Sequence, residues 1–253
     1  MSTLNAIKNS NTDAGNFAED FSMHYSQLRL QENRLYTDEQ VAALPFIDIG
    51  HPHHKEWMIR KRSAMSLTGY IQQKAAAPHI LEVGCGNGWL SMQMAAIPGS
   101  RVTGIDINGP ELDQAARVFP DTANLDFMEA SLDDPALQDR KFDFIVFAAT
   151  IQYFPNLKKT LRLALEHLTL LGEIIITDSR FYHSKEVAAA RQRSIDYFTG
   201  IGMPGMAAYY FHHRMDELEG FHYRVMSEPG SLKNKLALIR DPFHRIIIKN
   251  PYR

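Results

Sequence analysis

Hydrophobic and polar positions follow a regular order over most of the chain. Short apolar runs at residues 79–83, 101–106, 125–128, 142–147 and 173–178 are separated by segments with apolar residues at helical spacing. Helices are expected between these runs, through residues 89–94 and over 110–118 and 156–171, with Gly172 as the C-cap of the last one. Strands that alternate with helices are typical of βαβ units, so the sequence predicts an α/β fold with a mainly parallel sheet.

The N-terminal part of the chain has a different pattern. Residues 1–16 are polar and lack hydrophobic periodicity, which predicts a flexible N-terminus. Residues 17–36 carry aromatic and leucine side chains at roughly helical spacing, and a further helix is expected over residues 55–73, after a turn-rich link. Residues 17–77 are therefore expected to form a helical cap or lid ahead of the sheet.

The regular order breaks after the fifth apolar run. We interpret residues 179–214 as an insertion on the substrate side, because a Gly/Pro-rich stretch at 200–205 cannot be regular. The elements expected in and after it are a helix at 184–199, a short helix at 215–218 and strands at 221–226 and 243–249.

Composition and charge narrow the function classes. The chain has 253 residues, the size of one large α/β domain, and its 27 Lys and Arg against 29 Asp and Glu give a formal net charge of -2. Without a basic surplus, the sequence argues against a nucleic-acid partner. The single cysteine, Cys85, cannot form an internal disulfide, and no run has the ~20 apolar residues of a membrane span. No signal-peptide pattern precedes the helices, so we expect a soluble, cytoplasmic protein with no membrane partner.

The most informative segment is a glycine-rich turn after the first apolar run. It reads Glu82-Val83-Gly84-Cys85-Gly86-Asn87-Gly88, with glycines at alternate positions, where a backbone can turn tightly or let a ligand approach. A dinucleotide-binding turn, G-x-G-x-x-G, would require a glycine at position 89, but Trp89 stands there. The spacing therefore differs from that of a turn that binds a pyrophosphate.

This segment resembles the first motif of the class I S-adenosylmethionine-dependent methyltransferases. Asp106 closes the next strand, where that family holds an acid on the ribose hydroxyls. Residues 142–155 resemble the family's fourth strand and following loop, and the helix up to Gly172 resembles the approach to its "lkpGG" turn, although one glycine is present rather than two. The resemblance covers residues 78–178 strongly and 221–249 weakly.

The resemblance implies a Rossmann-like, doubly wound, seven-stranded methyltransferase domain over residues 78–253. It also implies S-adenosylmethionine as cofactor and S-adenosylhomocysteine as product. In this interpretation Arg60 either clamps the cofactor carboxylate or pairs with Glu56 on the surface, and Cys85 lies in the motif as a packing side chain. The residues that the resemblance places on the cofactor are Glu82, Gly84, Cys85, Gly86 and Gly88 in the turn, Asp106 and Ile107 at the ribose and adenine, Ser131 and Leu132 at the adenine edge, and Ala148, Ala149 and Gln152 at the methionine end.

The loop after the fourth strand separates the classes of methyl acceptor. It lacks the Asp/Asn-Pro-Pro-Tyr/Phe motif of enzymes that methylate nucleobase amines, and Gln152 and Tyr153 stand where quinone-biosynthesis enzymes often have two histidines. We therefore expect a small-molecule acceptor with a reacting oxygen, nitrogen or carbon. The catalytic candidates are Tyr153 and His183, which follows the fifth strand. The remaining histidines lack the spacing of metal ligands, so no metal is predicted.

Three other interpretations stay open at this point. An aminopropyl transferase would need an acidic pocket, whereas residues 148–154 are not acidic. A regulatory protein would bind the cofactor without turnover, and a protein methyltransferase would need a groove for a side chain. The sequence does not define the oligomeric state, and a homodimer is compatible with it.

Overall fold

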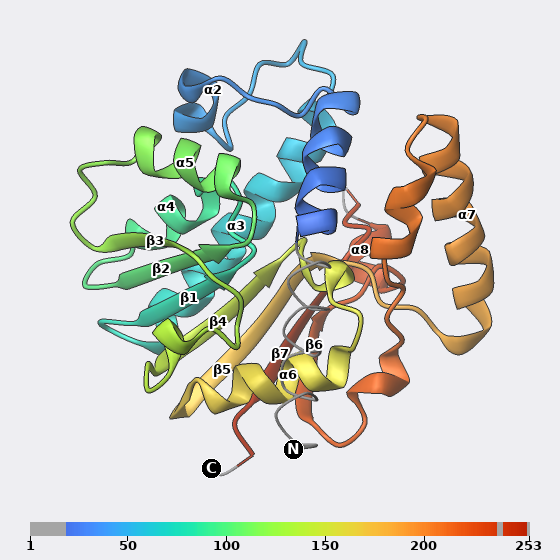
Figure 1. Ribbon diagram of the computed structural model, residues 1–253. Helices are drawn as coiled ribbons and strands as arrows, with labels where there is room; N and C mark the ends of the chain where they lie inside the picture. Colours follow the sequence, from blue (N-terminus) through green and yellow to red (C-terminus); the bar gives the residue numbers. More distant parts are fainter. Residues whose placement is uncertain (1–18, 237–239, 252–253) are drawn as a thin grey trace, which may run out of the picture.

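The computed structural model describes residues 19–236 and 240–251, and its centre is one seven-stranded sheet (Figure 1). The strand order is β3-β2-β1-β4-β5-β7-β6. The first five strands run parallel, and β7 is antiparallel to both of its neighbours. The strands are β1 (His79–Val83), β2 (Arg101–Asp106), β3 (Leu125–Glu129), β4 (Phe142–Ala148), β5 (Leu168–Ser179), β6 (His222–Ser227) and β7 (His244–Lys249). This confirms the predicted Rossmann-like α/β fold.

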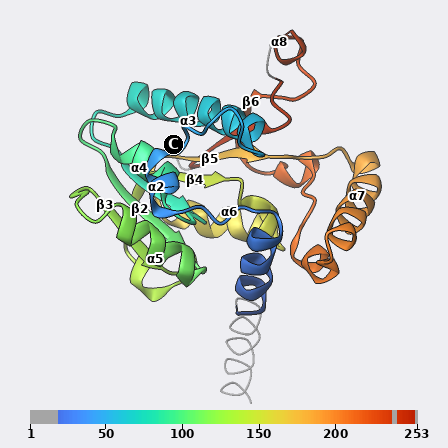
Figure 2. The same cartoon turned by 90° about the horizontal axis from the view of Figure 1, so that it is seen from above.

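Helices cover both faces of the sheet. Figure 2 shows the sheet between α3 on one side and α6 on the other. The α-helices are a first helix at residues 19–31, α2 (Asp38–Ala43), α3 (His54–Lys74), α4 (Trp89–Ala95), α5 (Gly109–Val118), α6 (Leu157–Glu166), α7 (Val187–Gly200) and α8 (Leu232–Lys235). Short 3-10 helices lie at Pro135–Leu137, Ile151–Tyr153, Ser184–Glu186, Pro204–Tyr209 and Met215–Leu218.

The two faces have separate apolar cores because successive side chains of a strand point to opposite sides. Ile174 and Ile176 of β5 pack with α6, whereas Ile175 between them packs with α3 and α4. All three side chains are fully buried, and burial of each contributes about 1.5–3 kcal/mol. A strand that is apolar at consecutive positions is therefore required where both faces are covered.

One predicted boundary is wrong. The helix expected over residues 156–171 ends at Glu166, and Gly172 is not its C-cap but lies inside β5. The strand starts early because Leu168 pairs with Phe142, and a register shift then follows between Phe142 and Phe144. A Cβ atom at Gly172 would lie 3.0 Å from the carbonyl oxygen of Phe142, so glycine serves close strand pairing here.

Two distant segments of the chain meet beyond the sheet. In Figure 1 the helix at residues 19–31 and α7 stand at the same end of the molecule. Phe21 and Leu28 of the first helix share an apolar cluster with Phe198 of α7 and Met206, all of them buried. The helix at 19–31 and α7 thus form one structural unit, although they come from the expected cap and the expected insertion. The predicted flexible segment 1–16 lies outside the described residues.

Candidate active site

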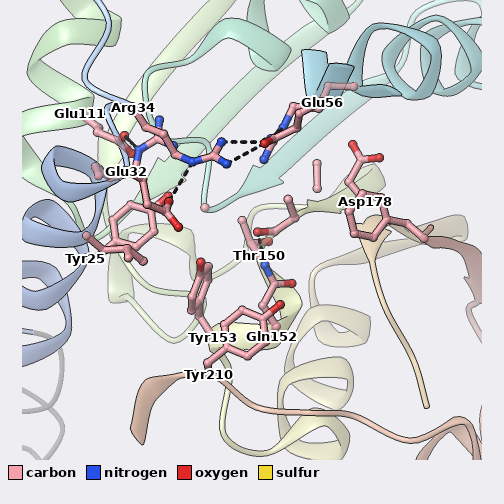
Figure 3. A pocket seen from close by; sticks show the side chains of 18 of the residues that line it. Tyr25, Glu32, Arg34, Glu56, Glu111, Thr150, Gln152, Tyr153, Asp178 and Tyr210 are labelled. Carbon is pink, nitrogen blue, oxygen red and sulfur yellow. Dashed lines mark hydrogen bonds and ion pairs between the residues drawn. The ribbon is translucent and has the colours of Figure 1, made fainter. Parts of the chain in front are cut away.

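A cavity of about 440 Å³ lies where the glycine-rich turn, the ends of β4 and β5, and the two outer helices meet (Figure 3). Parallel strands present their carboxyl ends, and the loops that follow them, at one edge of the sheet, where ligands bind in open α/β folds. The walls of the cavity come from most parts of the chain. They include Tyr25, Arg29, Glu32 and Arg34 from the N-terminal segment, Glu56, Trp57 and Arg60 from α3, Glu82, Gly84, Cys85, Gly86 and Asn87 from the end of β1 and the turn, Glu111, residues 148–150 with Gln152 and Tyr153, Asp178, and Arg193, Tyr197 and Phe198 from α7.

The three glycines of the turn are all in the left-handed region, with φ of +74° at Gly84, +52° at Gly86 and +76° at Gly88. A side chain would also collide at each position. A Cβ atom would lie 2.5 Å from Thr150 Cγ2 at Gly84, and 2.4 Å from Phe127 Cζ at Gly88. Gly84 and Gly86 line the cavity, whereas Gly88 is buried against Phe127. Gly88 therefore serves packing between the turn and β3, not access for a ligand.

Asp106 braces this turn through the backbone. Its Oδ2 accepts a hydrogen bond from the Gly86 N–H at 2.7 Å, and its Oδ1 accepts one from the Asn108 N–H at 2.9 Å. Burial and the nearby charge of Glu111 raise the pKa of Asp106 to about 6, against these backbone bonds. Glu111, in the first turn of α5, lines the cavity itself and pairs with Arg29 at 3.1 Å. Sequence reasoning missed Glu111, which lies five residues after Asp106, in the helix that follows β2.

Glu82 is fully enclosed beneath the turn. Its Oε2 accepts a hydrogen bond from Ser91 Oγ at 2.5 Å. Burial raises the pKa of Glu82 to about 8, although the bond from Ser91 opposes the shift. At neutral pH the carboxyl group is therefore largely protonated, and its charge is not available to a ligand.

An arginine network forms the wall on the α3 side (Figure 3). Arg34 donates two hydrogen bonds to the Glu56 carboxylate, at 2.8 and 2.6 Å, and Arg60 Nε donates a third at 2.9 Å. Burial opposes ionisation of Glu56, but the two arginines lower its pKa to about 2. Arg60 and Glu56 thus pair as expected from their spacing, yet both face the cavity and not open solvent.

The loop after β4 forms the floor. Ala149 is in the left-handed region with φ of +57°, and Thr150 Oγ1 donates to the Val83 carbonyl at 2.9 Å. Gln152 donates to the Ala149 carbonyl at 2.6 Å and accepts from Ser179 Oγ at 3.0 Å. Burial raises the pKa of Tyr153 well above its usual value, so the hydroxyl stays protonated and can donate, but not act as a base, at neutral pH.

The structure brings most of the predicted cofactor residues to the cavity, but not all. The predicted cofactor residues that line it are Arg60, Glu82, Gly84, Cys85, Gly86, Ala148, Ala149 and Gln152, and the catalytic candidate Tyr153 lines it as well. The others do not: Asp106 and Gly88 lie behind the turn, and Ile107 packs against the cluster formed by the helix at 19–31 and α7. Leu132 is in the core, and Ser131 is exposed and donates to Asp133. Cys85 is buried, and burial raises the pKa of its thiol, which fits a packing role.

His183 does not reach the cavity. It is exposed at the start of a 3-10 helix, where its backbone N–H donates to Glu186 at 2.9 Å. Across the described ranges, 19–236 and 240–251, no three His, Cys, Asp or Glu side chains group as metal ligands. Within the same part of the chain, no helix is long and apolar enough to span a membrane.

Comparisons with known proteins identify relatives of this chain by sequence. Residues 80–172 match the family model described as "Methyltransferase domain". The chain is 29% identical over 142 residues to a malonyl-[acyl-carrier protein] O-methyltransferase of Bacillus cereus, covering 54% of this chain and 51% of that protein. It is 34% identical over 96 residues to a ubiquinone biosynthesis O-methyltransferase of Actinobacillus pleuropneumoniae, covering 34% of this chain and 41% of the relative.

A solved structure extends the likeness in fold over most of the chain. The plantazolicin methyltransferase BpumL, crystallised with a monoazolic desmethylPZN analog and SAH, aligns with a TM-score of 0.54 at 16% identity. The alignment covers 92% of this chain and 97% of BpumL. By contrast, the sequence matches span about half or less of the two curated relatives.

Proposed function

We propose that this chain, which belongs to the class I S-adenosylmethionine-dependent methyltransferases, transfers the methyl group of S-adenosylmethionine to a small-molecule acceptor. S-adenosylhomocysteine would be the second product. The observation that carries the proposal is that the alternating-glycine turn opens into the same cavity as the ends of β4 and β5. The cavity thus joins the cofactor motif to the place where substrate loops emerge.

The donor groups of the cavity fit such a cofactor. Gly84 and Gly86 line the cavity, so the backbone of the turn faces the space that a ligand would occupy. Arg60 would meet the cofactor carboxylate, since its guanidinium lies in the wall and is oriented by Glu56. At the other end, Glu111 would lie near the ribose hydroxyls, while Asp106 holds the turn from behind. The bound cofactor supplies an activated methyl group on a sulfonium centre.

The protein's part in the reaction is alignment and the exclusion of water. Displacement at a methyl group needs the donor and acceptor atoms in line. A site that holds them in this geometry lowers the activation barrier, because the entropy of bringing them together is already lost on binding. The helix at residues 19–31 and α7 pack on each other over the cavity, which supports a closed site. The two curated relatives are O-methyltransferases by name, which supports oxygen as the reacting atom.

The test is an assay with S-adenosylmethionine labelled in its methyl group, incubated with the purified protein and either a small-molecule extract or a protein extract. We expect label in the small-molecule fraction. A Gly84→Val variant, which would place a side chain against Thr150, is the control and should transfer none. Label confined to proteins would favour a protein methyltransferase, and cofactor binding without any transfer would favour a regulatory protein.

A further inference from the structure

Asp178, near the end of β5, is a cavity residue to which the sequence assigns no role. The residue is 5% exposed and lines the cavity. Figure 3 shows Tyr25 and Glu111 on one side of the cavity and Asp178 on the other. If Glu111 lies near the cofactor's ribose, as proposed above, Asp178 lies toward the opposite end, where β4 and β5 finish and a methyl acceptor would enter.

The other carboxyl groups of the cavity are already engaged. Glu32 pairs with Arg34, Glu56 with Arg34 and Arg60, and Glu111 with Arg29. Glu82 is largely protonated at neutral pH because burial raises its pKa to about 8. Asp178, by contrast, takes part in no ion pair among the described residues. It is therefore the cavity carboxyl group best placed to take up a proton.

The carboxyl group is held by one oxygen. Ser63 Oγ, from α3, donates to Asp178 Oδ1 at 2.5 Å. No hydrogen bond within the described part of the chain engages Oδ2, and this atom is not among the fully enclosed unpaired atoms found there. A carboxylate fixed through one oxygen and open at the other has the geometry of a general base.

The backbone at Asp178 is strained. Its φ of +53° lies in the left-handed region, and Ala149, directly after the neighbouring strand β4, has φ of +57°. Both residues line the cavity. A left-handed conformation costs a residue other than glycine roughly 1–2 kcal/mol. Two such residues at adjacent strand ends indicate that this corner is shaped for function at some cost in stability.

The surroundings of Asp178 shift its pKa upward. Burial raises the pKa of Asp178, and so does the charge of Asp241, whereas Arg60, Arg245 and the bond from Ser63 lower it. The net direction is upward, which brings the carboxyl group closer to the pH at which a base is effective. Tyr153, the other candidate within the cavity, keeps its proton.

We propose that Asp178 is the general base of the transfer, and that the methyl acceptor reacts through a hydroxyl or amine group that carries a proton at neutral pH. This inference rests on the proposed function. As the methyl carbon leaves the sulfonium sulfur, the C–S electron pair stays on sulfur, which becomes a neutral thioether. The acceptor's O–H or N–H bond breaks, its electron pair is kept for the new bond to the methyl carbon, and the proton passes to Asp178 Oδ2. The neutral carboxyl group then releases the proton to solvent.

The test compares the wild-type protein with Asp178→Asn on probe acceptors. The ring of Tyr153 packs on the rings of Tyr25 and Tyr210 in the cavity wall, so the probes are aromatic: 4-methylphenol, 4-nitrophenol, benzylamine and benzoate. We expect the wild type to methylate the phenols or the amine; benzoate carries no proton at neutral pH, so any transfer to it should not depend on Asp178. Asp178→Asn should bind S-adenosylhomocysteine as the wild type does and lose at least about 100-fold in kcat on 4-methylphenol. The loss should shrink on 4-nitrophenol above its own pKa, because the ionised phenol needs no base.

A second variant keeps the proposal testable if Asp178→Asn fails to fold. Ser63→Ala removes the hydrogen bond to the charged carboxylate, so the acidic limb of the pH–rate profile should move to higher pH. The exposed Asp121→Asn should leave the profile unchanged.

Four results would overturn the inference. They are a wild-type rate in Asp178→Asn, an equal loss on both phenols, an unmoved profile in Ser63→Ala, or a wild type that binds S-adenosylhomocysteine but methylates no phenol or amine. Failure of the wild type to bind S-adenosylhomocysteine would instead refute the proposed function.

Discussion

The structural role of Gly88 gives the sharpest stability prediction. In Gly88→Ala the new Cβ atom would lie 2.4 Å from Phe127 Cζ and 2.9 Å from Ala115 Cβ, at a φ of +76°. The left-handed backbone costs about 1–2 kcal/mol for alanine, and overpacking costs about 1–3 kcal/mol. Together they predict a loss of about 2–5 kcal/mol in the free energy of unfolding.

Gly202→Ala is the matched control. Gly202 has nearly the same φ, +77°, but a Cβ atom there would meet no neighbouring side chain or backbone within 4 Å, so only the backbone cost of about 1–2 kcal/mol applies. Urea unfolding followed by circular dichroism measures both variants against the wild type. Equal losses for the two substitutions would refute the argument that Gly88 is required by contact with Phe127 and Ala115.

Three further predictions concern charged groups of the site. The folded-state pKa of Glu82 is raised from 4.5 to about 8, so its contribution to the free energy of unfolding is greatest below about pH 4.5. This contribution should fall as the pH rises to about 8, by at most about 1.4 kcal/mol per pH unit. Urea unfolding at several pH values should therefore show a flatter dependence of stability on pH for Glu82→Gln than for the wild type. Glu56→Gln weakens the hydrogen bonds from Arg34 and Arg60 at a partly buried site and should lower the free energy of unfolding by about 1–3 kcal/mol, measured by thermal unfolding. The control is Asp216→Asn, whose ion pair is exposed and in which the same assay should detect no change. Asp106→Ala removes the brace of the glycine turn and should weaken S-adenosylhomocysteine binding at least tenfold by calorimetry, and an unchanged affinity would exclude Asp106 from supporting the site.

The parts of the fold that depend on local pattern could be predicted from the sequence. The buried strands are recognisable by consecutive apolar residues, as at Ile174 to Ile176, and the turn by its three glycines. The end of α6 could not be predicted in this way. Its boundary depends on the pairing of Leu168 with Phe142 of another strand, which no local pattern encodes.

The candidate site was predictable only where it belongs to one continuous motif. Residues on the turn and after β4 line the cavity as expected, but Tyr25 and Arg29 reach it because the N-terminal helix packs against distant segments. Asp178 lies at the end of β5, where no motif marks it as a site residue. His183 was chosen for its position after β5, yet β5 extends to Ser179 and the chain then carries His183 outward to the surface. In an irregular segment, the direction of the backbone decides which side chain points into the site, and the spacing of residues along the sequence does not reveal this direction.

The central claim is that the cavity binds S-adenosylmethionine, and calorimetric titration of the purified protein with S-adenosylmethionine and S-adenosylhomocysteine tests it most directly. We predict binding of both at one site per chain, with an affinity that falls at least tenfold in Asp106→Ala. A folded protein that binds neither compound would contradict the claim, because the glycine turn and its brace would then serve only the packing of the sheet.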